Sequence, residues 1–180
     1  MTNPPATVWI NGELIPADRA TVSVYDRGFT SGDGVFETVK VVHGVPFAIT
    51  RHLRRLAESA HIIGFAPPPD AHLREAVAAT VDAHHARLGD LGRLRVTLTA
   101  GRPQGSGSVP TRGGSDLTLV LTADPQTPHP GELKVVSVPW PHNERGPLVG
   151  AKTTSYADNL AVLEQVRQKG ADEALISDTQ

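Results

Sequence analysis

One lysine stands where it could do covalent chemistry. Lys152 lies in the stretch GAKTTSYADN, between a Gly-Ala pair and a run of hydroxyl-bearing side chains. The small residues leave room for a ligand, and the hydroxyls can donate hydrogen bonds to it. A partly desolvated lysine has a lowered pKa and can attack an aldehyde to form a Schiff base. The competing interpretation is a solvated surface charge in a turn, so the rest of the chain must decide between the two.

Composition narrows the class of protein. The 180 residues suffice for one large domain or for one domain plus part of another. The net charge of -2 gives no electrostatic case for binding nucleic acid or an anionic membrane. The absence of cysteine excludes disulfides, thiolate metal sites and a cysteine nucleophile. We find no signal-peptide pattern and no apolar run near the roughly 20 residues of a membrane helix, and therefore expect a soluble, cytoplasmic protein.

The first two thirds of the chain predict a sheet with two helices. Asn11-Gly12 is typical of a tight hairpin turn between two short strands, and the glycine-rich segment 26–34 is too irregular for a strand. A mobile loop is expected over 101–108. Strands are predicted at Val8–Ile10, Glu13–Ile15, Thr21–Tyr25, Val35–Val42, Val45–Ile49, Leu94–Thr99 and Leu117–Thr122. One helix is predicted from an N-cap at Thr50 to Ile63, with Gly64 ending it, and a second from an N-cap at Asp70 to Leu88.

A proline-rich stretch predicts a domain boundary. Segment 124–131 holds three prolines and is interpreted as a linker between a domain over 1–123 and a second domain beginning at 132 and running to 180. In the second domain, strands are expected at Leu133–Val138 and Glu173–Asp178. The helix between them should bury Leu160, Leu163 and Val166 and end at Gly170.

Three segments together resemble the class IV aminotransferases, the pyridoxal-phosphate enzymes of fold type IV. Segment Asp26–Thr38, DRGFTSGDGVFET, resembles the N-terminal signature of that family, and Arg51–Ala60, RHLRRLAESA, resembles its first helix. Lys152–Tyr156, KTTSY, followed by Asn159, resembles the segment that carries the Schiff-base lysine. The segments occur in family order and at family-like spacing. The resemblance implies an α+β, two-domain fold whose small domain is complete and whose second domain is truncated.

The resemblance also implies roles for individual residues. Lys152 would bind pyridoxal 5'-phosphate and later move the proton at the substrate α-carbon. Arg55 would bind the phosphate, for which a guanidinium fork is well suited, although an exposed helix arginine is the ordinary alternative. Tyr156 would lie near the cofactor ring or the substrate, or else be a half-buried aromatic residue at the start of the helix. Four residues are expected in the substrate pocket: Ser31, Phe36, Lys40 and Arg95.

Two of these pocket residues have structural alternatives. Phe36 is equally compatible with a plain core position, and Arg95 with an arginine on an edge strand. Ser31 stands where relatives often carry an aromatic residue, which leaves the substrate choice open.

The resemblance leaves the reaction open between elimination and transamination. The first and third segments look most like those of the bacterial lyases in the family, which would make the protein a 4-amino-4-deoxychorismate lyase giving 4-aminobenzoate and pyruvate for folate synthesis. A branched-chain or D-amino-acid transaminase is the alternative, and a non-catalytic remnant is a third. The family's glutamate for the cofactor ring nitrogen would follow Gln180, so we expect an N-terminal part of a longer enzyme, nearly inactive alone. The family is dimeric, which predicts a homodimer.

Other chemistries find little support. Gly32–Gly34 lacks the spacing of a nucleotide-binding loop. His84 and His85 are adjacent, so their side chains point in different directions and make a poor metal pair. The eight histidines form no ligand cluster with acidic residues, and no Ser-His-Asp nucleophile motif is present. We therefore expect no metal.

Overall fold

The chain forms two compact units. The computed structural model describes residues 6–103, 116–129 and 131–179. One unit comprises Met1–Thr127 together with Ala151–Thr154, and the other comprises Pro128–Gly150 together with Ser155–Gln180. The lysine segment therefore belongs to the first unit although it follows the start of the second in sequence. None of the helices in the described ranges combines the length and apolar character needed to cross a membrane.

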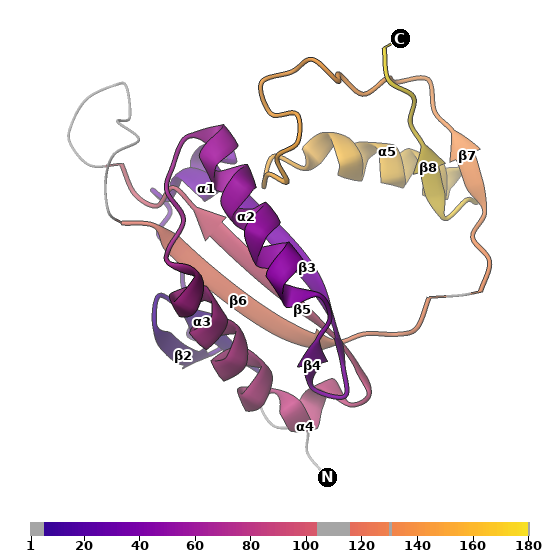
Figure 1. Cartoon of the computed structure of the whole chain (residues 1–180). Coiled ribbons are helices and arrows are strands. Elements are labelled where there is room, and N and C mark those ends of the chain that lie inside the picture. Colours follow the sequence, from indigo (N-terminus) through magenta and orange to yellow (C-terminus); the bar gives the residue numbers. More distant parts are fainter. Residues whose placement is uncertain (1–5, 104–115, 130, 180) are drawn as a thin grey trace. The chain divides into compact units, whose positions relative to one another are not determined.

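The first unit is built on a six-stranded antiparallel sheet (Figure 1). Its order is β2-β1-β6-β5-β3-β4, so the long strands β3 and β5 lie side by side near one edge. The strands are β1 (Thr7–Ile10), β2 (Glu13–Pro16), β3 (Gly34–Val42), β4 (Val45–Pro46), β5 (Leu91–Thr99) and β6 (Thr118–Pro125). The alternation of β3 buries Val35, Val39 and Val41 on one face, as expected for a strand covered on one side.

Two helices cover that face of the sheet (Figure 1). They are α2 (Ile49–Ile63) and α3 (Asp70–Ala83), followed by the single turn α4 (His85–Leu88). Helix α2 ends at Gly64, whose φ of 95° is a left-handed conformation that glycine adopts without steric cost. Leu53, Leu56 and Ala60 of α2 belong to the same buried apolar cluster as Val35 and Val39 of β3. This layer fixes α2 over β3.

Several predictions about the first unit are confirmed. The β1–β2 hairpin turns at Asn11 and Gly12, both at positive φ, and the long strand at β3 and the end of α2 at Gly64 are found as predicted. The helix predicted to Leu88 is interrupted, since His84 ends α3. The His84 ring donates from Nδ1 to the Thr80 carbonyl at 2.7 Å and accepts at Nε2 from the Thr7 amide at 3.3 Å.

Other local predictions are wrong. The alternating segment Thr21–Tyr25 forms no strand, and part of the glycine-rich segment is a short helix, α1 (Arg27–Ser31), capped by the Asp26 carboxylate. Of Val45–Ile49, only Val45 and Pro46 pair with β3. Helix α2 starts after Ala48, so Thr50 is not the N-cap, and α3 starts after Pro69, so Asp70 is its first residue. The mobile-loop prediction lies, from residue 104 onward, outside the described residues.

The predicted linker begins inside a strand. Asp124 and Pro125 at the end of β6 pair with Arg93 and Gly92, so β6 runs two residues into segment 124–131. A proline is tolerated there because it lies at the last position of the strand, where it removes no interior ladder bond.

The second unit is small. Strand β7 (Val135–Ser137) pairs in parallel with β8 (Glu173–Leu175), and α5 (Ala157–Gln168) connects them. Its buried apolar residues are Val138, Val166 and Ala171. The prediction that Leu160 points inward is wrong, since it is 61% exposed; Val166 is buried as predicted. Both strands are shorter than predicted, because the pairing covers only three residues.

Candidate active site

The segment that carries Lys152 forms a short addition to the edge of β3. The Phe36 amide donates to the Lys152 carbonyl at 3.0 Å, and the Thr154 amide donates to the Gly34 carbonyl at 2.8 Å. The Thr154 hydroxyl donates to the Gly32 carbonyl at 2.9 Å. Strand β4 pairs with the far end of the same strand, at Val41 and Val42. Segment 151–154 therefore pairs along the edge of β3 that faces away from β5, on a stretch that β4 does not reach.

Helix α2 fixes this segment from a second direction. The Lys152 amide donates to the Ser59 hydroxyl oxygen at 3.0 Å, and Ser59 is fully buried. The backbone of Lys152 is therefore held by β3 through its carbonyl and by α2 through its amide. A lysine in a solvated turn has no need of such anchoring, so the geometry favours the first of the two interpretations of Lys152.

The environment of the Lys152 amine lowers its pKa. Burial is the main cause, because desolvation disfavours the charged form; Glu37 opposes it, and the guanidiniums of Arg55 and Arg95 add to the lowering. The Lys152 Nζ lies 4.2 Å from the centroid of the Phe36 ring. This cation–π contact also favours the ammonium, but the net direction remains a pKa below the ordinary lysine value.

The Phe36 ring makes cation–π contacts with both Lys152 and Arg95. It is 5% exposed, and the Arg95 Cζ lies 3.9 Å from its ring centroid. Arg95 also donates from Nε to the Thr97 hydroxyl at 3.1 Å. Phe36 lies outside the main apolar cluster that contains its neighbours Val35 and Val39. The structure thus places Phe36, Arg95 and Lys152 together, as their predicted roles require; those roles stay predictions.

The buried carboxylate of Glu37 binds two side chains of α2. The Glu37 side chain is 0% exposed, and it accepts hydrogen bonds from His52 and Arg55. The Arg55 Nε donates to Oε1 at 2.6 Å and its Nη2 to Oε2 at 2.5 Å, while the His52 Nδ1 donates to Oε2 at 2.7 Å. The hydrogen bond to Glu37 raises the pKa of Arg55.

Sequence reasoning missed Glu37 as a site residue, although a signal was available. It alternates with Val35 and Val39, and this spacing places a carboxylate on the buried face of β3. A charge at such a position needs a cationic partner, which the helix that follows could supply.

A cationic hollow adjoins Arg55. It has a volume of about 290 Å³ and is lined by the N-cap and part of α2: Ala48, Arg51, His52, Arg54, Arg55 and Glu58. Its three guanidiniums outnumber the two carboxylates paired with them, Glu58 and Glu37, so the hollow favours an anion. The Arg55 side chain is 51% exposed and can therefore reach a ligand.

The three remaining predicted residues are exposed on α1, on β3 and just before α5. Ser31 is exposed at the end of α1 and donates its hydroxyl to the Arg27 carbonyl at 3.0 Å. Lys40 is exposed on β3 in direct register with Arg93. Tyr156 precedes α5 in the second unit and is 38% exposed. The roles expected of these three residues stay predictions.

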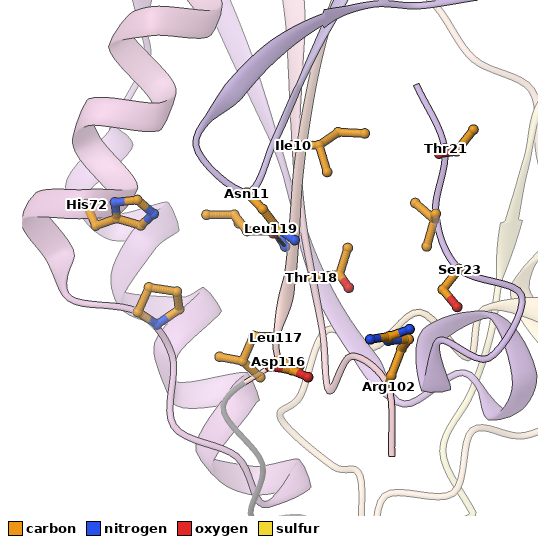
Figure 2. Close-up of a pocket in the computed structure, with 12 residues that line it drawn as sticks. Ile10, Asn11, Thr21, Ser23, His72, Arg102, Asp116, Leu117, Thr118 and Leu119 are labelled. Atoms are coloured by element: carbon orange, nitrogen blue, oxygen red, sulfur yellow. Dashed lines mark hydrogen bonds between the residues drawn. The ribbon is translucent and has the colours of Figure 1, made fainter. Parts of the chain in front are cut away.

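A larger hollow lies elsewhere on the first unit (Figure 2). Its volume is about 700 Å³, and Figure 2 shows Asn11, His72 and Arg102 among its lining residues. Several of its polar atoms are already bonded within the fold. The Asn11 Oδ1 accepts from the Leu119 amide, and the Thr118 hydroxyl donates to Asp26. None of the predicted site residues lines it, and we assign it no function.

Comparison with known proteins gives a consistent picture. The family model described as Amino-transferase class IV matches residues 34–180. A bifunctional aminodeoxychorismate lyase / D-amino acid transaminase of Mycobacterium tuberculosis is 30% identical over 96% of the chain and 60% of the relative. A D-alanine aminotransferase of Bacillus licheniformis is 28% identical over 94% of the chain and 59% of the relative. The chain thus spans about three fifths of the length of these relatives.

Solved structures share the fold. A fold IV transaminase from Curtobacterium pusillum superposes with a TM-score of 0.83 at 29% identity, over 97% of this chain and 64% of that one. A hypothetical aminotransferase from Mycobacterium tuberculosis, solved in a PLP-bound form, superposes with a TM-score of 0.79 at 28% identity, over 97% and 62% of the two chains.

Proposed function

This chain belongs to the class IV aminotransferase family, and on that premise we propose that Lys152 is the catalytic lysine of a PLP-dependent 4-amino-4-deoxychorismate lyase. The observation that carries the proposal is the Lys152 amine itself. The backbone of Lys152 is anchored to β3 and to α2. Burial lowers the pKa of its amine, and the positive charges of Arg55 and Arg95 lower it further. The products would be 4-aminobenzoate and pyruvate, as part of folate synthesis.

The residues present fit the cofactor. PLP carries an aldehyde, which requires an uncharged amine, and a phosphate, which requires cations. Lys152 supplies the amine, and Arg55, beside the cationic hollow on α2, supplies a guanidinium. When bound, PLP is an electron sink for negative charge that develops at the substrate α-carbon.

The chain's own residues would then bind the cofactor, bind the substrate and move a proton. Lys152 would hold the cofactor and afterwards move the proton at the substrate α-carbon through its Nζ atom. Arg55 would bind the phosphate. Arg95, fixed over Phe36, would bind a substrate carboxylate, and Tyr156 would lie near the cofactor ring or the substrate. Ser31 and Lys40 would border the substrate pocket.

A transaminase is the second candidate. The Bacillus relative is named a D-alanine aminotransferase, and the Mycobacterium relative is named for both activities. A lysine that moves a proton at the α-carbon serves either reaction, so assays must choose. We also propose a homodimer, which sedimentation or size-exclusion chromatography with light scattering would test.

The test is to express the complete coding sequence that contains these residues and to add PLP. We expect a visible absorbance band that Lys152→Ala removes, with a loss of turnover of at least about 100-fold, the lower end for a positioned acid–base group. Lys169→Ala, at an exposed lysine just after α5, is the matched control and should keep both the absorbance band and the turnover.

The assays then separate the reactions. Release of 4-aminobenzoate and pyruvate from aminodeoxychorismate would support the lyase. Exchange of amino groups between amino acids and keto acids, without that release, would support the transaminase. A protein that stays colourless with PLP would contradict both and support the non-catalytic remnant.

A further inference from the structure

We propose that Glu37 is a positioning residue that fixes Arg55 for the phosphate of the cofactor. This inference deepens the proposed function and rests on it. Glu37 would touch neither cofactor nor substrate. It would act by holding one edge of the Arg55 guanidinium, so that the other edge is presented to the phosphate in a set orientation.

The first step of the argument is the burial of Glu37. Its side chain is 0% exposed, and a buried carboxylate is costly unless it is paired and hydrogen-bonded. The neighbours that share its face of β3, Val35 and Val39, are also fully buried. An apolar side chain would be the cheaper occupant of such a position, because replacing a buried ion pair by well-packed apolar residues is often neutral or stabilising. Stability alone therefore does not account for the carboxylate.

The second step is the geometry of the pair. Arg55 bonds Glu37 through Nε and Nη2 at 2.6 and 2.5 Å, which is a bidentate fork. These two bonds use two of the five guanidinium N–H groups. The remaining part of the side chain contributes to its 51% exposure and borders the cationic hollow. One edge of the guanidinium is thus occupied inside the fold, while the other can meet a ligand.

The third step is the contribution of His52. It lies three residues before Arg55 on α2, so both side chains reach the same carboxylate. The His52 Nδ1 donates to Oε2 at 2.7 Å. This bond fixes the carboxylate itself, and through it the arginine, whose long side chain would otherwise be costly to immobilise when the phosphate binds.

The experiment compares PLP with pyridoxal, which lacks the phosphate. Affinities for both are measured by absorbance titration of the full-length product, as wild type and as Glu37→Gln. Loss of a charge-assisted hydrogen bond predicts a roughly 10- to 100-fold weaker affinity for PLP. Affinity for pyridoxal should change much less, so the ratio of the two affinities should fall. Arg55→Ala should lower the ratio similarly, and the double variant should lower it no further.

Matched controls separate positioning from folding. Asp33 is also a largely buried carboxylate in an ion pair, with Arg27 in the same unit, and the two side chains are 7% and 13% exposed. Asp33→Asn should therefore cost stability but leave the PLP-to-pyridoxal ratio unchanged. Glu37→Asp keeps the charge and should restore part of the ratio. An equal loss of affinity for both ligands in Glu37→Gln, or an unchanged ratio, would overturn the inference.

A second readout needs no cofactor. Inorganic phosphate should raise the unfolding temperature of the wild type more than that of Glu37→Gln or Arg55→Ala. If the wild type shows no Lys152-dependent absorbance with PLP but keeps a phosphate protection that Glu37→Gln weakens, the proposed function fails, and only the positioning of Arg55 for a phosphate group survives. If the wild type binds PLP and the Glu37→Gln ratio is unchanged, only the inference fails. Absence of phosphate protection in the wild type would also count against it.

Discussion

At the scale of single residues, the site is defined by how four charges are arranged around β3. Glu37 compensates Arg55 on the helix-covered face, while Arg95 lies over the ring of Phe36. Lys152 is influenced by all three charges, with Glu37 raising its pKa and the two arginines lowering it. The amine is therefore tuned by its neighbours in addition to its own burial.

This tuning predicts a pH dependence of stability. The pKa of Lys152 is lower in the folded state than its ordinary value of 10.5, so between these two values the unfolded chain binds more protons than the folded one. The free energy of unfolding should therefore gain a favourable contribution as pH rises through that window. Lys152→Met removes the contribution, so the variant should be more stable than wild type at neutral pH, and the difference should narrow toward pH 10.5.

Urea unfolding at several pH values measures this difference directly. The titrations of other groups are common to both proteins and cancel. Lys169→Met, at an exposed position, gives the baseline for removing a lysine charge. The difference in the free energy of unfolding between wild type and Lys152→Met should narrow as pH rises. If it stays constant or widens, Lys152 is not desolvated in the folded protein.

At the scale of elements, the segment around Lys152 depends on α2 as much as on β3. Ser59 accepts the Lys152 amide at 3.0 Å from a fully buried position. Ser59→Ala would leave that amide without its acceptor, at a cost of about 1–3 kcal/mol. We expect faster hydrogen exchange at Lys152 and its neighbours, by roughly 5- to 150-fold, since every 1.4 kcal/mol is a factor of ten.

Amide exchange followed by NMR or mass spectrometry tests this prediction. Thr80→Ala is the matched control, because Thr80 is also fully buried and its hydroxyl donates to the Ala76 carbonyl within α3. It should leave exchange at Lys152 unchanged, and Ser59→Thr should restore protection. Unaltered exchange in Ser59→Ala would mean that β3 alone holds the segment.

The elements also show which predictions a sequence supports. Local signals were sufficient at Asn11-Gly12 and at Gly64, because a turn or a helix end needs only backbone geometry that these residues favour. The alternation of Thr21–Tyr25 was misleading, since strand formation requires a neighbour to pair with and none is present there among the described residues. Thr50 likewise has the chemistry of a cap, but the helix begins one residue before it.

The candidate site was only partly predictable for the same reason. Family resemblance pointed to Lys152, Arg55 and Arg95, and the structure brings Lys152 and Arg95 onto the same aromatic ring. The hydrogen bond between Glu37 and Arg55 joins residues 18 positions apart in sequence. The one between Ser59 and Lys152 joins residues 93 positions apart, and no local pattern specifies such contacts. Only the alternation of β3, which places Glu37 on the buried face, indicated that a partner was needed.

At the scale of the whole molecule, the two units differ in how much apolar surface they bury. The first unit has a core that joins one sheet face to two helices. In the second, the described apolar residues that are buried are Val138, Val166 and Ala171, whereas Leu160 and Leu175 are more than 60% exposed. Its sheet has two parallel strands of three residues each, and two-stranded sheets are marginal without further packing. The units should therefore differ in local stability.

We expect amides in α5 to exchange at least about tenfold faster than those in α2, because local opening in the second unit exposes a much smaller core. Hydrogen exchange with mass spectrometry on the 180-residue chain measures both helices in one sample. Val166→Ala, which truncates the fully buried side chain of α5, should accelerate exchange in α5, β7 and β8 while leaving α2 unchanged. Equal protection of α5 and α2 in the unmodified chain would contradict the difference, and acceleration of α2 by Val166→Ala would show that the two units open together.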